Sequence, residues 1–297
     1  MNSLIFKFKN HVKVLLSILL IAALIISVAV FFYYQHLSGQ NIVKISISNQ
    51  FPKDFPWDLE LLSQPPKVTW IDKTGKIKSF YSEGLPYNDN KTDIFAYYAT
   101  PGSISGDLSK DRNLPGIVIV HGGGQSAFKF VVNLWAQRGY AAISMSLDGY
   151  GPDLVRLKNG GPPQKTYMSY DWNYHAVAKN ILAHSLMLSF PEIDKSRTAI
   201  NGYSVGGQLT CIAAGIDHRF KAAASVFGTG FIYKKGVFKQ WYQTLTPEEQ
   251  RQWRDLIDPS NYFDHITCPF LYVGNPNDKY YPMDIFVESY AHLKGPF

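Results

Sequence analysis

The sequence predicts an α/β domain with a mostly parallel β-sheet and helices on both faces, preceded by a single N-terminal transmembrane helix. Beyond Pro115, short apolar runs rich in β-branched residues alternate with helical stretches, which is the pattern of buried parallel strands joined by helices. Val14 to Tyr34 is an uncharged run of about the 20 residues that a helix needs to cross a bilayer. An apolar content of 46% with 18% charged residues is typical of a globular protein.

The first 66 residues give the expected domain organisation before the main domain. Three lysines precede the apolar run, so residues 1–13 are expected in the cytoplasm, 14–34 form a signal anchor, and the remainder is extracytoplasmic, periplasmic or at the cell surface. A cleaved signal peptide is the alternative, but the run exceeds the usual length and no clear Ala-x-Ala site follows. Residues 35–66 are a linker and arm. Phe51 to Pro66 holds four prolines and is expected to be extended rather than helical.

The main domain, residues 67–297, begins with antiparallel signals and continues with alternating ones. A hairpin is expected around the Lys73–Gly75 turn, and Asp93 to Thr100 is a further strand. The parallel strands are expected at Ile117–Val120, Ala141–Met145, Thr198–Asn201, Ala222–Phe227 and Phe270–Val273. Apolar residues at helical spacing predict a long helix over Asp171 to Phe190.

Two segments interrupt this alternation, Gly149 to Tyr170 and Phe231 to Ile266. The second contains Thr246-Pro247-Glu248-Glu249, a capping box that predicts a helix start. Insertions at the carboxyl ends of strands commonly shape ligand pockets in such sheets. Three aromatic residues near strand ends would either stack against a sugar or aryl ester or belong to the core: Tyr150, Tyr170 and Trp172.

Charge and cysteine content exclude several classes. Removing the three N-terminal lysines from the net charge of +6 leaves +3 with no basic run, so nucleic-acid binding is not expected. Cys211 and Cys268 lie far apart and without metal-ligand spacing, which favours buried thiols over a disulfide. No pair of histidines has zinc-ligand spacing. We expect neither a metal nor a cofactor.

The stretch Ile200 to Leu209 holds a Gly-x-Ser-x-Gly pattern centred on Ser204. It is predicted to be a strand, a tight turn and a helix, which is the context in which such a serine projects above the sheet as a nucleophile. Without that context the pattern would equally fit an ordinary glycine turn.

A second glycine motif, His121-Gly122-Gly123-Gly124, follows a predicted strand. Glycines leave backbone N–H groups free to stabilise a developing oxyanion, and the alternative of a phosphate-binding loop lacks its motifs. His121 lies within this motif and before the serine, so we expect it to hold the loop by hydrogen bonds rather than to act as a base.

The carboxylate of the site is predicted to be Asp278. It lies in the turn after the strand that ends at Val273, in the chain order of serine and then acid that nucleophile-elbow enzymes share. The alternative is a turn-forming aspartate without a catalytic role.

Taken together, the three motifs resemble the α/β-hydrolase superfamily, in particular serine hydrolases of the dienelactone hydrolase and acetyl xylan esterase-like type, from about Lys67 to the end of the chain. The resemblance implies an α/β-hydrolase fold, with Ser204 as nucleophile, Asp278 as acid, and the backbone amides of Gly123 and Val205 as oxyanion hole. It also implies hydrolysis of small acyl, acetyl-type esters, with acetylated carbohydrate as one substrate class.

The third triad member is not found in this pattern. Only nineteen residues follow Asp278 in the chain of 297, and they read as one helix, Met283 to Leu293, with His292 inside it. We expect the family's histidine, with its preceding strand, beyond Phe297, so that residues 1–297 alone would be inactive and poorly folded.

Two other functions stay open. A peptidase of the prolyl-oligopeptidase type uses the same core, although such enzymes usually carry a large N-terminal domain for which the space before Lys67 is too short. A non-catalytic binding protein that kept the fold and lost the histidine is the second alternative. A histidine in a post-strand loop would favour the esterase.

Overall fold

The computed structural model describes residues 55–164 and 167–294. Val14 to Tyr34, the expected anchor, lies outside these residues, and none of the helices within them is both long and apolar enough to span a membrane. The strands are β1 (Val68–Asp72), β2 (Lys78–Tyr87), β3 (Asn90–Ala99), β4 (Leu114–Val120), β5 (Ala141–Met145), β6 (Ile193–Tyr203), β7 (Ala222–Val226) and β8 (Phe270–Val273).

These strands form one sheet with the order β1-β2-β3-β5-β4-β6-β7-β8. The first three pairings, from β1 to β5, are antiparallel. The remaining four pairings, from β5 to β8, are parallel. The expected hairpin, the further strand and all five parallel strands are confirmed. Because β5, β4 and β6 are parallel neighbours in the sheet, their carboxyl ends meet at one edge of it.

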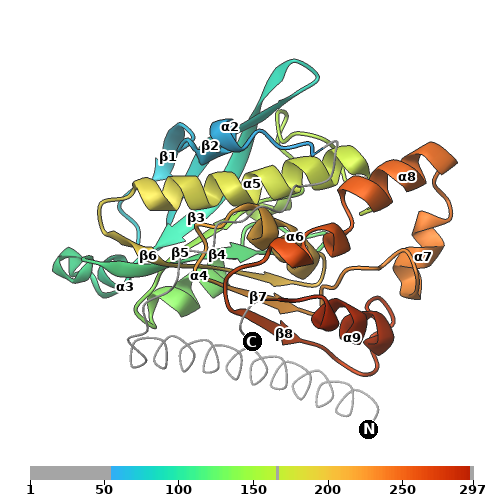
Figure 1. Ribbon diagram of the computed structural model, residues 1–297. Helices are drawn as coiled ribbons and strands as arrows, with labels where there is room; N and C mark the ends of the chain where they lie inside the picture. The colour runs from blue at the N-terminus through green and yellow to red at the C-terminus, as the bar shows by residue number, and fades with distance from the viewer. Residues whose placement is uncertain (1–54, 165–166, 295–297) are drawn as a thin grey trace, which may run out of the picture. The chain divides into compact units, whose positions relative to one another are not determined.

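Helices cover both faces of the sheet, as Figure 1 shows. The long helix α5 (Tyr170–Ser189) and α6 (Val205–Ile216) pack side by side on one face, while α4 (Lys129–Ala136) lies on the other. α9 (Met283–Ala291) lies on the face of α6, since Tyr272 of β8 contacts both Cys211 of α6 and Phe286 of α9. The remaining helices are α2 (Leu59–Ser63), α3 (Pro101–Ser105), α7 (Gly236–Tyr242) and α8 (Pro247–Leu256). Short 3₁₀ turns span Leu108–Lys110, Pro152–Leu154, Pro259–Asn261 and Phe263–His265.

The core lies between the parallel strands and these helices. Every residue of β5 and β7 is buried, because strands with helices on both faces have no solvent side. On β4, Val118 pairs with Ile143 on one side and Ile200 on the other, and all three side chains are at most 1% exposed. Burial of each such side chain stabilises the fold by about 1.5–3 kcal/mol.

The arm before the sheet departs from the expectation. Leu59 to Ser63 is helical, whereas the proline-rich stretch was expected to be extended. No proline falls between Pro56 and Pro65. Asp58 caps the helix by accepting a hydrogen bond from the Leu61 N–H, and the fully buried Leu62 side chain joins the core. A cap and one apolar anchor are therefore enough to fold five residues between prolines.

Other local expectations hold with shifted boundaries. The strand expected from Asp93 begins at Asn90, because Asn88 and Asp89 adopt left-handed φ values and close a tight hairpin with β2. The capping box is present in full, with Thr246 and Glu249 each bonded to the other's backbone N–H. Cys211 and Cys268 are buried free thiols, as expected.

Candidate active site

Ser204 stands at the sharp turn between β6 and α6. Its backbone has φ 56° and ψ −122°, a combination that residues other than glycine rarely adopt. The Ser204 N–H donates to the Val226 carbonyl at 2.7 Å, and the Ser204 carbonyl accepts from the Gln208 N–H at 3.1 Å. These bonds on both sides of the residue hold the strained turn in place, which directs a serine out of the sheet edge.

The flanking glycines are required by close backbone approach. A Cβ atom on Gly202 would lie 2.1 Å from the Gly206 carbonyl oxygen. A Cβ atom on Gly206 would lie 2.4 Å from the His121 carbonyl oxygen. Both distances are far below van der Waals contact, so only glycine fits at either position. The Gly-x-Ser-x-Gly spacing therefore reflects the packing of this turn against the end of β4.

The glycine motif after β4 lies directly beside the serine. A Cβ atom on Gly122 would lie 3.6 Å from the Cβ of Ser204. Among the described residues, the N–H groups of Gly123 and Val205 form no hydrogen bond. Two unpaired N–H donors next to a projecting hydroxyl make an arrangement that can hold a negatively charged oxygen.

His121 holds this loop, as the sequence predicted. Its Nδ1 lies 2.6 Å from the Gly122 carbonyl oxygen, and its Nε2 accepts from the Leu147 N–H at 2.8 Å. These partners require a neutral ring protonated on Nδ1. Burial lowers the pKa of His121 to about 4. With both nitrogens occupied and the ring 1% exposed, His121 is not available as a base.

A second support of the loop, which the sequence pattern did not indicate, is Asp148. Its Oδ2 accepts from the Gly124 N–H and its Oδ1 from the Trp172 indole N–H, each at 3.0 Å. Burial is the main cause that raises the pKa of this carboxyl, which is 1% exposed. The available signal was its position three residues after Met145, where the neighbouring strand β5 ends. Trp172, also 1% exposed, therefore belongs to the core and not to a substrate platform.

The insertion at Gly149 to Tyr170 is fixed above the same edge. Tyr167 covers the glycine loop, since a Cβ atom on Gly123 would lie 2.2 Å from its ring. The buried Lys179 ammonium donates to the Leu147 carbonyl at 2.8 Å, and burial lowers its pKa to about 8. The Arg156 guanidinium donates to the carbonyls of Asp148 and Gly161. The insertion is thus bonded to the strand end that supports the loop.

Asp278 lies in the turn after β8. Its Oδ1 accepts from the N–H groups of Tyr280 and Tyr281 at 2.8 and 3.0 Å, so it does form the turn that was the alternative interpretation. Among the described residues its Oδ2 has no hydrogen bond, which leaves one oxygen able to accept from a further group.

Tyr281 is a buried tyrosine close to the predicted catalytic residues. Its side chain is 2% exposed. Burial and the charge of Asp278 raise its pKa, while the Ser204 side chain lowers it. Its hydroxyl nevertheless forms no hydrogen bond of ordinary geometry. The Tyr281 hydroxyl is therefore a buried neighbour of Ser204 that the sequence did not indicate.

Within the described part of the chain, no hydrogen bond or ion pair joins a histidine to Ser204 or Asp278. His292 is the C-cap of α9, and its ring packs against Phe231 at 5.1 Å between centroids. It does not contact Asp278, in agreement with its rejection as a base. No group of three or more potential metal ligands occurs in the described residues.

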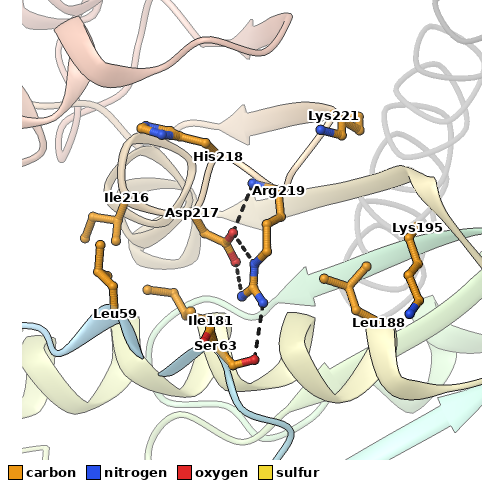
Figure 2. A pocket seen from close by; sticks show the side chains of 10 residues that line it. All are labelled: Leu59, Ser63, Ile181, Leu188, Lys195, Ile216, Asp217, His218, Arg219 and Lys221. Carbon is orange, nitrogen blue, oxygen red and sulfur yellow. Dashed lines mark hydrogen bonds and ion pairs between the residues drawn. The ribbon is translucent and has the colours of Figure 1, made fainter. Parts of the chain in front are cut away.

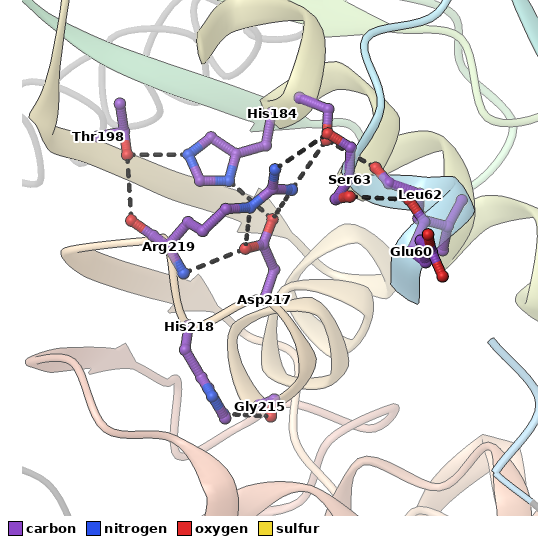
Figure 3. A network of polar contacts seen from close by, with 10 residues as sticks. Glu60, Leu62, Ser63, His184, Thr198, Gly215, Asp217, His218 and Arg219 are labelled. Carbon is purple, nitrogen blue, oxygen red and sulfur yellow. Dashed lines mark hydrogen bonds and ion pairs between the residues drawn. The ribbon is translucent and has the colours of Figure 1, made fainter. Parts of the chain in front are cut away.

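The only Asp–His–hydroxyl chain among the described residues lies elsewhere (Figure 3). It includes Thr198, where the continuous pairing of β6 with β4 begins, and we call this point the amino end of β6. His184 Nδ1 lies 2.8 Å from Asp217 Oδ2, and His184 Nε2 lies 2.8 Å from Thr198 Oγ1. His184 and Thr198 are fully buried, so no substrate reaches this hydroxyl. His184 is a packed residue of α5.

A strained serine beside unpaired N–H donors, on a mostly parallel sheet, is the arrangement of the α/β-hydrolase fold, and the expected class of serine hydrolase is confirmed. The comparison with family models identifies a particular family within this class. The model described as "Prolyl oligopeptidase family" covers residues 126–294, more than half of the chain. The chain belongs to this family of serine hydrolases, whose peptidases are the alternative that the sequence left open.

Solved structures with the same fold include both esterases and peptidases. An acetyl xylan esterase from Paenibacillus sp. R4 is 24% identical over 85% of this chain and 88% of its own, with a TM-score of 0.62. Acetyl Xylan Esterase 1 from Thermoanaerobacterium sp. JW/SL YS485 is 16% identical over 84% and 86%, with a TM-score of 0.64. An acylaminoacyl peptidase from Pyrococcus horikoshii is 20% identical over 75% of this chain but 36% of its own, with a TM-score of 0.57.

Proposed function

We propose that this protein is a serine esterase that hydrolyses small acyl esters of the acetyl type, with acetylated carbohydrate as the substrate class to test first. The observation that carries the proposal is the strained Ser204 turn beside the glycine loop, since it combines a nucleophile with unpaired N–H donors. No cofactor is needed for this chemistry.

Each residue has a role in the proposed reaction. Ser204 Oγ bonds to the acyl carbon while its proton passes to a histidine base, and the carbonyl oxygen becomes an oxyanion that the Gly123 and Val205 N–H groups stabilise. The alcohol then leaves with that proton, and water hydrolyses the acyl-enzyme. Asp278 Oδ2 would orient the histidine and stabilise its protonated form.

We prefer esters over peptides as substrates because of the share of each related structure's length that this chain matches. The chain matches most of the length of the Paenibacillus esterase, 88%, but only 36% of the Pyrococcus peptidase. Such likeness concerns the fold alone, so the substrate stays a proposal. A peptidase is the second candidate, because the matched family model describes prolyl oligopeptidases.

The test compares an ester with an amide on the protein purified from its native source. We expect hydrolysis of p-nitrophenyl acetate and acetate release from acetylated xylan, with little cleavage of N-acetyl-alanine p-nitroanilide. Ser204→Ala is expected to lower kcat/KM by about 10³-fold or more. Faster cleavage of the anilide would favour the peptidase, and an unchanged rate in Ser204→Ala would exclude this serine.

Among the described residues no histidine is bonded to Ser204 or Asp278, so two measurements address the source of the base. The intact mass of the native protein is compared with 33.5 kDa, since a larger mass of several kilodaltons agrees with further C-terminal sequence. Residues 1–297 alone are expected to give no burst of p-nitrophenol, because Ser204 without a base is an ordinary alcohol. A stoichiometric burst from this chain would contradict the expectation.

We further propose that Val14 to Tyr34 anchors the protein in a membrane with the hydrolase domain outside the cytoplasm. The support is the length of the uncharged run and the lysines before it. Externally added protease should degrade the hydrolase domain in intact cells or spheroplasts while a cytoplasmic marker survives. Protection of the domain until lysis would overturn this orientation.

A further inference from the structure

A hollow of about 510 Å³, shown in Figure 2, lies near the end of α6 that is far from Ser204. It is formed by α2, the second half of α5, the end of α6 and the starts of β6 and β7. Ser204 and Ile216 lie at opposite ends of α6, which has 12 residues and is about 18 Å long at 1.5 Å per residue. The hollow is therefore not part of the candidate active site, and its volume is in the range of small-molecule sites.

One part of the wall is aliphatic. Leu59 from α2, Ile181 and Leu188 from α5, and Ile216 from α6 line the hollow. Figure 2 shows that these side chains come from both sides of the hollow. Such a wall favours a ligand with a hydrocarbon portion, because transfer of apolar surface out of water is favourable.

The other part of the wall is cationic. Lys195 from β6 and Lys221 before β7 line the same hollow as Arg219. Among the described residues, neither lysine ammonium forms an ion pair or a hydrogen bond. Asp217 is the one acidic residue in the lining, and its charge is matched by Arg219. The lining therefore carries a net charge of about +2, which favours an anionic group.

Arg219 is fixed in place by the buried network beneath the hollow (Figure 3). Its Nε and Nη2 donate to the two carboxylate oxygens of Asp217 at 2.7 and 2.8 Å, and Nη2 also donates to Ser185 Oγ at 2.8 Å. Its Nη1 makes only a 3.5 Å contact with the Ser63 carbonyl. The guanidinium is thus held rigidly with one nitrogen whose donors are largely unused, a geometry suited to binding an anion.

We propose that this hollow binds an amphipathic anion, a phosphate or carboxylate with a short aliphatic chain. The anionic group lies between Lys195, Lys221 and Arg219 Nη1, and the chain lies against the aliphatic wall. The proposal does not depend on the esterase reaction at Ser204, and its test needs no catalysis. Lipid headgroups and free acyl or alkyl anions share this chemistry.

The test is calorimetric titration of the full chain held in phosphatidylcholine nanodiscs, with empty nanodiscs as the blank. The probes are hexyl phosphate, inorganic phosphate and hexanol, so that the anion and the chain are separated. We expect hexyl phosphate to bind at least tenfold more tightly than either of the others. Equal affinity for hexyl phosphate and inorganic phosphate, or for hexyl phosphate and hexanol, would overturn the amphipathic assignment.

Paired lysine variants locate the site. Lys195→Ala/Lys221→Ala should weaken hexyl phosphate binding at least tenfold without a change in Tm, because both side chains are exposed. Lys73→Ala/Lys76→Ala removes the same charge from the exposed turn between β1 and β2 and should leave binding unchanged. An equal effect of the two pairs would mean general charge attraction and would overturn the site.

A last arm separates the two sources of ligand. Nanodiscs with 20% phosphatidylglycerol are compared with neutral ones in the same titration. Lower apparent affinity for hexyl phosphate in the anionic discs, lost in Lys195→Ala/Lys221→Ala, identifies a lipid headgroup as the occupant. Unchanged affinity identifies a soluble anion as the occupant. With either occupant, the proposal requires that hexyl phosphate binds as described above.

Discussion

The two ends of β6 contain the same kinds of side chain and differ in access. At the amino end, Thr198, His184 and Asp217 form a complete chain of hydrogen bonds, but its hydroxyl is fully buried and its carboxylate is neutralised by Arg219. At the carboxyl end, Ser204 has a strained backbone, Asp278 has an unpaired oxygen, and two N–H donors are unpaired among the described residues. A triad-like set of contacts therefore does not identify an active site. Strain and unpaired donors at an accessible edge are more informative.

If the amino-end network is structural, removing its charge should reduce stability and not activity. Asp217→Asn is expected to lower the free energy of unfolding by about 3 kcal/mol, because a buried carboxylate with a cationic partner is replaced and the Arg219 charge is left unpaired. Urea unfolding measures this. The matched control is Asp194→Asn, whose pair with Arg197 is more exposed and should cost less than about 1 kcal/mol. Equal losses would show that the network is no more than a surface ion pair.

The buried His121 predicts a stability that depends on pH. The pKa of this ring is about 4 in the folded protein against 6.5 when exposed. Between these values the unfolded chain binds a proton that the folded one does not, so stability falls as pH falls from 6.5 to 4. At pH 4.5 the loss is about 2.5 kcal/mol for one such group. His175, with its pKa also lowered to about 4 by burial, adds a loss of the same sign.

Urea unfolding at pH 7 and pH 4.5 measures the sum, and NMR of the His121 ring isolates one residue. The ring is expected to keep its neutral chemical shifts down to about pH 4.5. Titration of the ring near pH 6.5 in the folded protein would show that it is not held neutral, and the structural role assigned to it would then fail.

Support of the glycine loop by Asp148 gives a kinetic prediction for the active-site end. Asp148→Asn replaces one carboxylate oxygen by an NH₂ group, and either Gly124 N–H or the Trp172 indole loses its acceptor. We expect kcat to fall by about 10–100-fold with KM little changed, because the affected donors act on the oxyanion and not on the bound ester. Asp153→Asn, an exposed aspartate of the same insertion, is the control. A rise in KM with unchanged kcat would assign Asp148 to substrate binding.

Much of the fold follows from local patterns, as the β-strands from β3 to β8 show. Continuous β-branched runs such as Ile117–Val120 are typical of strands buried between helices. The capping box at Thr246 and Glu249 predicts a helix start because its two side chains accept hydrogen bonds from each other's backbone N–H groups. The arm helix at Leu59–Ser63 was missed because its stability comes from Leu62 in a distant core. Tertiary contact decided that segment, and no local signal outweighs four prolines.

The site was predictable where the chemistry is tied to backbone geometry. Gly202 and Gly206 make Ser204 recognisable in the sequence, because no other residue fits at their positions in this turn. Asp148 and Tyr281 were missed because an aspartate after a strand and a tyrosine in a turn have no distinctive spacing. Their roles arise from the sheet order, which brings the ends of β5, β4 and β6 together and places β8 beside β7.

The smallest effect tests whether strain at Ser204 is real. Ser204→Gly places at φ 56° the one residue that adopts this conformation without strain, and the gain of about 1–3 kcal/mol is partly offset by the greater flexibility of glycine in the unfolded chain. We therefore expect the free energy of unfolding to rise by about 1 kcal/mol. Ser204→Ala removes the same hydroxyl but keeps the Cβ atom, so its stability should stay close to that of the unmodified protein. If the two variants are equally stable in urea, the turn stores no strain, and the contrast with the relaxed, fully bonded Thr198 reduces to solvent access alone.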